Sequence, residues 1–304
     1  VAVLWPVTPC PVWIADLHPR FVEISLSLRP LLHPRLQQLQ EEISEYTFAN
    51  LFLFRRAHHY RIAKLLDDSF VIVGNDGGKP FFMLPFGLVE ENLLTELFSR
   101  FETIKCVPES KAQKFRELGY SVIEDRDNFD YLYSQKDLAC LSGRKFDKKR
   151  NLIKAFINHY TYEGKPLLEE YFPDAMEVLE KWKENREEPG DYAAAREALE
   201  NMEELQLCGG VYYVDGKPVA YSLGEEIPGA QAFVIHFEKA VSEYKGLWQF
   251  VNQAFASILP EKYTYINREQ DLGDPGLRKA KLSYNPVKFA KKYRAFPSAD
   301  PENR

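Results

Sequence analysis

The sequence has only four cysteines, and their spacing argues against two common kinds of stabilising centre. No pair forms a Cys-x-x-Cys motif, and no histidine accompanies a cysteine at ligand spacing. Structural zinc and a disulfide framework are therefore not expected, and we predict no metal site. Free thiols are typical of a reducing compartment, which predicts a cytoplasmic protein. The four residues are Cys10, Cys106, Cys140 and Cys208.

Long apolar runs are also missing. No stretch approaches the ~18 consecutive apolar residues that a membrane-spanning helix requires, so no transmembrane segment is expected. Residues 1–30 contain scattered prolines and no basic leader, which does not fit a secretory signal peptide. We interpret residues 1–30 as an extension that docks on the rest of the protein as extended chain.

Three widespread catalytic motifs are absent. The sequence contains no Gly-x-x-x-x-Gly-Lys-Ser/Thr loop, no Gly-x-Ser-x-Gly elbow and no His-Glu-x-x-His helix. These absences exclude nucleotide hydrolysis at a P-loop, the usual serine hydrolase arrangement and proteolysis of the zincin type.

The composition is that of an ordinary globular protein. Hydrophobic residues make up 45% of the 304 residues and charged residues make up 28%. The 39 basic and 45 acidic residues give a net charge of −6, so the chain as a whole is not a polyanion binder. A local basic surface remains compatible with this balance. The length suits two domains of about 150 residues each.

Hydrophobic periodicity predicts a mixed α/β fold in two similar halves. Each half has helices, then a series of strands, a further helix and a closing strand, which suggests domains at residues 31–140 and 141–304. In the first half we predict helices at 34–45, 46–55, 90–101 and 109–118, with strands at 61–66, 69–74, 80–85, 105–107 and 120–124. In the second half we predict helices at 146–160, 169–186, 191–205 and 247–258, with strands at 208–214, 218–223 and 231–238.

The strand predicted at residues 231–238 carries a candidate general base. Strict alternation would place Phe233, Ile235 and Phe237 on one face, with Val234, His236 and Glu238 on the other. A histidine beside a carboxylate on one strand face could act as a base with its partner. The alternative is a pair of hydrogen-bonded polar groups on a half-exposed strand.

Two basic segments are candidates for binding phosphate. Lys148, Lys149, Arg150 and Asn151 lie in a cationic helix start, where positive charge opposes the helix dipole and therefore invites an explanation. The alternative is a solvated helix start at a domain boundary. Lys245 and Gly246 precede the clearest helix, whose N-terminal N–H groups could face an anion such as a pyrophosphate. The alternative there is a plain loop.

The stretch at residues 266–286 concentrates the most chemistry. It leaves an apolar run with Asn267, Arg268, Glu269 and Asp271, crosses a glycine-rich loop and enters a basic helix. Residues 275–299 contain seven basic residues and no acid, and within them Arg278 and Lys281 are three residues apart. A paired Arg and Lys on one helix face can bind a phosphate or a carboxylate. The alternative is a capped strand end followed by a solvated helix.

Four motifs together resemble the phosphatidylglycerol lysyltransferase C-terminal-like family. The resemblance covers residues from about 31 to 296 and is closest to the soluble, stand-alone members. The motifs are Glu45-Tyr-Thr-Phe-Ala-Asn-Leu-Phe, Glu124-Asp-Arg-Asp-Asn-Phe-Asp-Tyr, Lys148-Lys-Arg-Asn-Leu-Ile, and Ile266-Asn-Arg-Glu-Gln-Asp-Leu-Gly-x-x-Gly-Leu-Arg-Lys-Ala-Lys-Leu-Ser-Tyr-x-Pro.

This resemblance implies two tandem acyltransferase folds of the GNAT type, as in the Fem peptidyltransferases. Membrane-bound members of the family move an aminoacyl group from tRNA to a lipid hydroxyl. Their multi-pass membrane part has no counterpart in this sequence, which argues against a lipid acceptor. The coenzyme A loop of ordinary GNAT enzymes is matched here by Gly246 alone. Their C-terminal signature is matched by Gly276, Leu277, Arg278, Lys281, Pro286 and Tyr293.

The resulting hypothesis is a transferase that moves an acyl or aminoacyl group to an amine or a hydroxyl. Arg278 and Lys281 would hold the donor phosphate or the developing oxyanion, and Asp271 or Glu269 would orient the acceptor. Lys149 and Arg150 would steer an anionic donor, either aminoacyl-tRNA or acyl-coenzyme A. Two alternatives remain open: a non-catalytic binding or assembly protein with the same fold, and an RNA-binding module.

Overall fold

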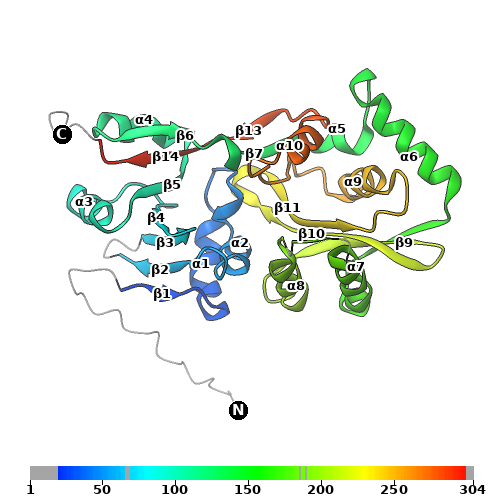
Figure 1. Ribbon diagram of the computed structural model, residues 1–304, viewed down its shortest axis with the longest axis horizontal. Helices are drawn as coiled ribbons and strands as arrows, with labels where there is room; N and C mark the ends of the chain where they lie inside the picture. The colour runs from blue at the N-terminus through cyan, green and yellow to red at the C-terminus, as the bar shows by residue number, and fades with distance from the viewer. Residues whose placement is uncertain (1–19, 66–68, 185, 189, 299–304) are drawn as a thin grey trace, which may run out of the picture.

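The computed structural model describes residues 20–65, 69–184, 186–188 and 190–298, which form two seven-stranded sheets side by side (Figure 1). The first sheet has the order β1 (Val22–Glu23), β2 (Arg61–Lys64), β3 (Phe70–Asp76), β4 (Lys79–Met83), β5 (Thr103–Pro108), β14 (Lys292–Phe296) and β6 (Ser121–Glu124). The second has the order β13 (Lys288–Ala290), β7 (Asp130–Ser134), β12 (Tyr265–Asn267), β11 (Ala232–Ala240), β10 (Lys217–Ile227), β9 (Cys208–Val214) and β8 (Tyr162–Pro166).

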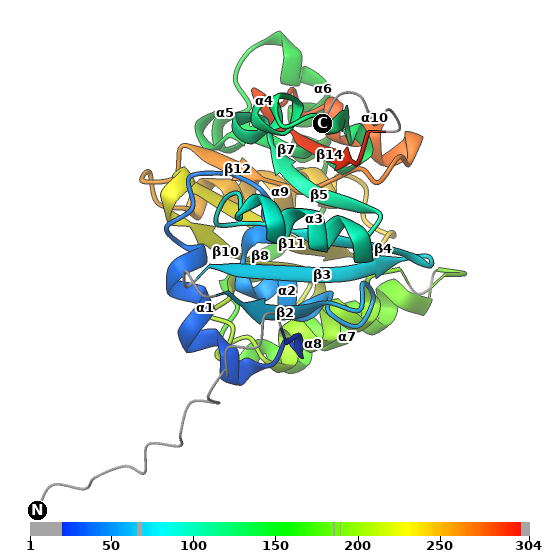
Figure 2. The same ribbon diagram turned by 90° about the vertical axis from the view of Figure 1, so that its left-hand side faces the viewer.

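The helices cover both sheets and fill the space between them. Those of the first half are α1 (Arg29–Leu36), α2 (Phe48–Leu53), α3 (Glu91–Arg100) and α4 (Glu109–Glu117). Those that follow are α5 (Gln135–Cys140), α6 (Asp147–His159), α7 (Phe172–Glu184), α8 (Tyr192–Glu200), α9 (Leu247–Ile258) and α10 (Pro275–Leu282). Figure 2 views the molecule from the side of the first sheet, with strands β2–β5 toward the viewer.

Each sheet contains one parallel pair of strands joined by a helix. In the first sheet β4 and β5 run parallel, with α3 between them in the chain. In the second, β11 and β12 run parallel, with α9 between them. The β11–β12 pairing covers only three residues of each strand and ends at Val234 and Asn267. Beyond that point β11 continues without β12, and the loop that follows Asn267 begins.

The chain exchanges strands between the two sheets. β7 and α5 come from the first half of the sequence, but β7 pairs with β12 and β13 in the second sheet. β14 comes from the C-terminal end and lies between β5 and β6 of the first sheet. The sheets therefore do not divide at residue 140, where the sequence predicts a domain boundary. The domain limits at 31–140 and 141–304 remain a prediction.

Helix α2 packs at the centre of the molecule. All six of its residues are buried, and the Thr47 hydroxyl caps it by accepting a hydrogen bond from the Asn50 N–H at 3.2 Å. Phe48 and Phe52 belong to a hydrophobic core that includes strands of both sheets and helices α7 and α8. Two further cores lie under α3 and α4 and under α5, α6 and α9. One shared core therefore holds the two sheets together.

Most of the predicted elements agree with the structure, and the exceptions are as follows. The helix predicted at 34–45 is wrong beyond Leu36, because α1 starts at Arg29, contains Pro34 and ends two residues later. The sequence does not predict helix α5 or strands β7, β8, β13 and β14. The residues of β7 are buried on both faces, so they show no alternation that would reveal a strand. Of the predicted extension at 1–30, residues 1–19 lie outside the described residues, and Val22–Glu23 forms strand β1, which pairs with β2.

A β-bulge changes the faces of β11. Leu223 of β10 faces Phe237 and the next residue, Gly224, faces Ile235, so His236 is the extra residue on β11. Phe233 and Ile235 consequently pack in the core under α9, whereas Phe237 packs in the core that contains α2. The prediction that Phe233, Ile235 and Phe237 share one face is wrong, because the alternation reverses at the bulge.

Candidate functional site

The segment at residues 267–286 leaves the second sheet where β11 and β12 separate. Glu269 and Leu272 have φ angles of 53°, and Gly273 has a φ of 79°. Left-handed conformations are uncommon outside glycine and cluster at functional sites, where surrounding contacts hold them. The Asp274 carboxylate then accepts a hydrogen bond from the Leu277 N–H at 2.5 Å and starts α10, with Pro275 at its first position.

Asp271 anchors the first part of this segment. Its fully buried carboxylate accepts hydrogen bonds from Arg278 at 2.9 and 2.6 Å, from Arg126 at 3.2 Å and from the Tyr131 hydroxyl. Burial alone would raise the pKa of Asp271, but hydrogen bonds from Arg278 and Tyr131 hold it below its usual range. Arg278 also donates to Asp127 at 2.7 Å. Asp271 is therefore a permanent carboxylate that positions Arg278, and it is unsuited to act as a base at neutral pH.

Lys281 lies under the same segment, one turn further along α10. Its ammonium group donates to the backbone carbonyl oxygen of Arg268 at 2.6 Å and to that of Gln270. Burial and the nearby charge of Arg268 lower the pKa of Lys281 to about 8. An amine with such a pKa exchanges a proton readily near neutral pH, which is the property required of a general acid or base.

Two further cations, from separate parts of the chain, converge beside Lys281. Lys149 of α6 donates to the Ser283 hydroxyl at 2.7 Å and lies 3.8 Å from the centre of the Tyr284 ring. The guanidinium of Arg268 lies 5.5 Å from the same ring and donates to Glu238 at 2.7 Å. The pKa of Lys149 is lowered by burial and by the charge of Arg268. The charge of Arg268 thus repels both Lys149 and Lys281, and we call these three residues the cation cluster.

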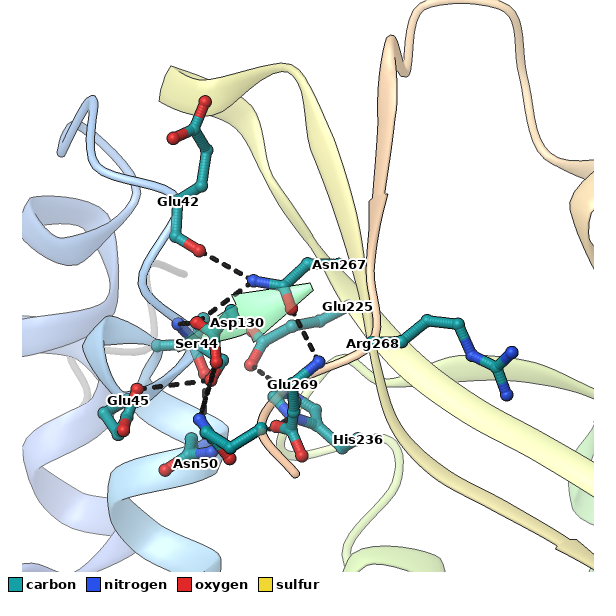
Figure 3. A network of polar contacts seen from close by, with 12 residues as sticks. Glu42, Ser44, Glu45, Asn50, Asp130, Glu225, His236, Asn267, Arg268 and Glu269 are labelled. Carbon is teal, nitrogen blue, oxygen red and sulfur yellow. Dashed lines mark hydrogen bonds and ion pairs between the residues drawn. The ribbon is translucent and has the colours of Figure 1, made fainter. Parts of the chain in front are cut away.

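On the opposite face of β11, His236 is held between two carboxylates (Figure 3). Its Nδ1 lies 2.8 Å from Glu269, and its Nε2 lies 3.0 Å from Glu225. Glu269 also accepts a hydrogen bond from the Asn50 side chain of α2 at 3.2 Å. Burial would lower the pKa of His236, but the hydrogen bonds with Glu225 and Glu269 raise it to about 10. His236 is therefore an imidazolium at neutral pH, and it is unsuited to act as a general base.

The bulge also separates His236 from Glu238. Glu238 bonds Arg268, and Figure 3 shows the Arg268 side chain pointing away from the His236 network. The prediction that His236 and Glu238 lie on one face is wrong, because the bulged residue reverses the alternation between them. The carboxylate partners of His236 are Glu225 and Glu269, which come from β10 and from the loop after β12.

A second network joins this segment to the N-terminal half. The buried carboxylate of Asp130 accepts hydrogen bonds from Lys292 at 2.8 Å and from Gln270 at 2.7 Å. The Asn267 amide donates to Asp130 at 3.3 Å and to the Glu42 carbonyl oxygen at 2.7 Å (Figure 3). Burial alone would lower the pKa of Lys292. The negative charges of Asp130 and another nearby carboxylate instead raise the pKa of Lys292 above that of an ordinary lysine. Asn267 thus fixes the loop between the two halves.

The other predicted phosphate ligands do not converge with the cation cluster. Arg150 donates to the backbone oxygen of Gly143 at 2.8 Å and stabilises the loop before α6. Gly246 has a φ of 89°, and a Cβ there would lie 2.3 Å from the Leu152 oxygen, so this glycine permits close packing on α6. Three further residues are exposed to solvent, namely Lys148, Asn151 and Lys245.

The residues of the family's C-terminal signature do not all lie at one site. Arg278 and Lys281 contact residues 268–271, whereas Tyr293 lies in β14 of the first sheet, 3.3 Å from Glu124. Sequence reasoning missed Glu225, Asp130 and Lys292 as partners of the site. Asp130 belongs to the family motif that begins at Glu124, so the resemblance could have indicated it. Nothing in the local sequence marks Glu225 or Lys292.

Among the described residues, no group of three His, Cys, Asp or Glu side chains is arranged to hold a metal ion. Within those same limits, no helix has the length and apolar character needed to cross a membrane.

The family model described as "Phosphatidylglycerol lysyltransferase, C-terminal" matches residues 36–296. A solved structure of a conserved protein of unknown function from Bacteroides thetaiotaomicron VPI-5482 is 32% identical with a TM-score of 0.82, and the alignment covers 92% of this chain and 99% of that one. The C-terminal domain of a putative lysylphosphatidylglycerol synthetase from Agrobacterium fabrum is 13% identical with a TM-score of 0.62, covering 92% and 94% of the two chains.

The structure of FemX is 8% identical with a TM-score of 0.57, covering 90% of this chain and 96% of that one. At this identity the likeness shows the fold, and the predicted mixed α/β architecture with two tandem GNAT-like units is confirmed. An uncharacterized protein of Mycoplasmoides gallisepticum is 27% identical over 176 residues, which span 54% of each chain. The chain thus matches about half the length of that curated relative.

Proposed function

This chain belongs to the phosphatidylglycerol lysyltransferase C-terminal family, and we propose that it transfers an acyl or aminoacyl group from an activated, anionic donor to an amine or a hydroxyl. The observation that carries the proposal is the cation cluster. Lys149, Arg268 and Lys281 meet at the point where the parallel strands β11 and β12 separate, and Glu238 is the carboxylate bonded among them.

An anion between these side chains would offset the repulsion that Arg268 exerts on Lys149 and Lys281. Burial lowers the pKa values of Lys149 and Lys281, and the charge of Arg268 lowers both further. A phosphate or a developing oxyanion would stabilise their charged forms, and pre-aligned donors favour a transition state in which negative charge develops. The same cluster would then serve both to bind the donor and to stabilise the reacting carbonyl.

The transfer itself requires one proton to move. The acceptor nitrogen or oxygen attacks the acyl carbonyl carbon, a new C–N or C–O bond forms, and the bond to the leaving oxygen or sulfur breaks. The proton released by the acceptor must reach the leaving group. Lys281 is the candidate carrier, since its pKa of about 8 allows it to give and regain a proton. Arg278 stays paired with Asp271 and Asp127, and we assign it to positioning the loop.

Aminoacyl-tRNA is our preferred donor class over acyl-coenzyme A. The loop before α9 would hold the pyrophosphate of coenzyme A, but Gly246 packs there against the backbone of α6. The exposed Lys148 and Lys245 lie on α6 and just before α9, and Lys149 connects α6 to Ser283 at the end of α10. Exposed cations on α6 and just before α9 suit a large polyanionic donor, because phosphate contacts provide sequence-independent affinity.

A second candidate function is a non-catalytic binding protein with the same fold. It is favoured because the polar side chains of the 267–286 segment are already hydrogen-bonded within the protein. Asn267, Gln270, Asp271 and Arg278 all bond to residues outside the segment. Such a protein would bind the anionic donor at the cation cluster and release it without transfer.

The test measures transfer and binding separately. We would incubate the purified chain with labelled aminoacyl-tRNA or acyl-coenzyme A and a pool of amine and hydroxyl acceptors, and follow the label. The variants are Lys281→Ala and Lys149→Ala. The matched control is Lys279→Ala, which removes an exposed lysine from the same helix as Lys281.

We expect Lys281→Ala to lower the transfer rate by about 100-fold or more, as removal of a general acid does. Lys149→Ala should mainly weaken donor binding, and Lys279→Ala should change neither quantity. Donor binding without transfer under every acceptor condition would support the non-catalytic protein. Equal transfer by the Lys281→Ala and Lys279→Ala variants would contradict the assigned chemistry.

A further inference from the structure

A polar cavity lies at the ends of β9, β10 and β11, beside helix α1. Its volume is about 230 Å³, and none of the residues assigned above to donor binding lines it. Pockets for drug-sized ligands measure roughly 300–1,000 Å³, so this cavity suits a smaller molecule. The lining residues that matter here are His33, Gln206, Cys208, Glu225, Glu226 and Phe233.

The cavity wall is rich in hydrogen-bond acceptors. Glu225 is 4% exposed, and one of its oxygens already accepts a hydrogen bond from His236. Glu226 is bonded by Lys262 at 2.7 Å and by the Tyr263 hydroxyl at 2.8 Å. Among the described residues the lining contains no Lys or Arg. The cations that balance these carboxylates therefore lie behind or outside the wall, and the cavity itself faces two carboxylates.

His33 supplies an independent sign that a ligand belongs there. Its side chain lines the cavity, it is 8% exposed, and its Nε2 is buried with no hydrogen-bond partner among the described residues. Burial and the charge of Arg29 lower the pKa of His33, which favours the neutral imidazole. A neutral imidazole nitrogen can accept a hydrogen bond from a ligand N–H. Buried polar groups without partners are rare in native proteins and call for an explanation.

We propose that this cavity binds a small molecule that carries a primary ammonium group. An ammonium has three N–H donors and no acceptor, which complements a wall of two carboxylates and a neutral imidazole. Hydrogen bonds between charged groups are about twice as strong as neutral ones. The ring of Phe233 provides an apolar contact for the rest of an amine of amino-acid size, beside Gln206, whose side chain hydrogen-bonds His33.

The cavity is linked to the loop after β12 but does not depend on the transfer reaction. Glu225 reaches Glu269 through His236, across hydrogen-bond distances of 3.0 and 2.8 Å. A bound amine would therefore lie at one end of a short chain of polar contacts that ends in residues 267–286. The inference rests on the cavity and its lining alone, so a binding experiment tests it whether or not the chain is a transferase.

The experiment compares three probes of equal length and different charge. Isothermal titration calorimetry on the full chain would use pentylamine, pentanol and pentanoate near neutral pH. We expect pentylamine to bind at least about tenfold more tightly than pentanol, which corresponds to one charge-assisted contact, and we expect no measurable binding of pentanoate. Comparable binding of pentanol and pentylamine, or no binding of the amine, would overturn the proposal.

Two variants locate the binding. Glu226→Gln keeps the shape of the side chain and removes one carboxylate, and Cys208→Trp fills the cavity with an indole ring. Both should weaken pentylamine binding at least about tenfold. Glu163→Gln is the matched control, because Glu163 lies on β8 with its side chain 62% exposed and does not line the cavity. Circular dichroism shows whether each variant is folded, and unchanged binding in both folded variants would refute the assignment.

Discussion

The stability of this protein should fall as the pH rises from about 6.5 to about 8, because of His236. Its fully buried ring lies between Glu225 and Glu269 at 3.0 and 2.8 Å. These carboxylates raise the pKa of His236 to about 10 in the folded chain, whereas a histidine in the unfolded chain titrates near 6.5. The folded state therefore retains a proton that the unfolded state loses.

The sign and size of the effect follow from proton linkage. A raised folded pKa gives stability that is complete below about 6.5 and is lost as the pH rises toward about 10. Each pH unit between the two values costs up to about 1.4 kcal/mol. From about pH 6.5 to about pH 8 the loss is between about 1.5 and 2 kcal/mol, because the unfolded state is half protonated at the start. Lys281, with its lowered pKa of about 8, contributes in the opposite direction above this window.

The assay is urea unfolding followed by tryptophan fluorescence at several pH values in this window. The perturbation is His236→Gln, which keeps hydrogen-bonding atoms but cannot carry a charge. It should lower the free energy of unfolding by about 3–5 kcal/mol near pH 6.5, because two carboxylates lose their buried partner. It should also flatten the pH dependence. The control is His159→Gln, at an exposed histidine in α6, which should keep the slope of the wild type. If the free energy of unfolding changes equally with pH in the wild type and in His236→Gln, then His236 is neutral when folded.

Two further predictions concern stability elsewhere in the site. Lys292→Met should lower the free energy of unfolding by about 3–5 kcal/mol in urea titrations, because it leaves the fully buried Asp130 carboxylate without its cation. A loss below about 1 kcal/mol, typical of an exposed pair, would contradict the buried pairing. Gly246→Ala should cost at least about 2 kcal/mol, since its φ of 89° disfavours a side chain and its Cβ would meet the Leu152 oxygen at 2.3 Å. An unchanged melting temperature would show that the α6 contact is not tight.

The local pattern of apolar residues was sufficient to predict an element when that element has one buried face. The helix predicted at 247–258 matches α9, and the helices predicted at 90–101 and 109–118 match α3 and α4 within a residue or two at each end. These segments repeat apolar residues at helical spacing, so the periodicity itself reports burial. The family motifs added the fold, which periodicity alone could not have specified, because many architectures share the same sequence of elements.

The sequence pattern did not predict the structure at positions where the pairing of distant segments decides it. The bulge at His236 depends on the register between β10 and β11, and no residue of β11 alone reveals it. The same holds for β14, which enters the first sheet from the far end of the chain. Both errors concern contacts between segments that are remote in sequence.

The sequence by itself predicted that the chemistry lies at residues 266–286 and singled out Arg278, Lys281 and Asp271 within this segment. Only the tertiary structure decided what each of these side chains contacts. Asp271 neutralises Arg278, whereas Lys281 joins Lys149 and Arg268 in an environment that lowers its pKa. The physical reason is that charge and acidity depend on burial and on neighbouring charges, which folding brings together from remote parts of the chain.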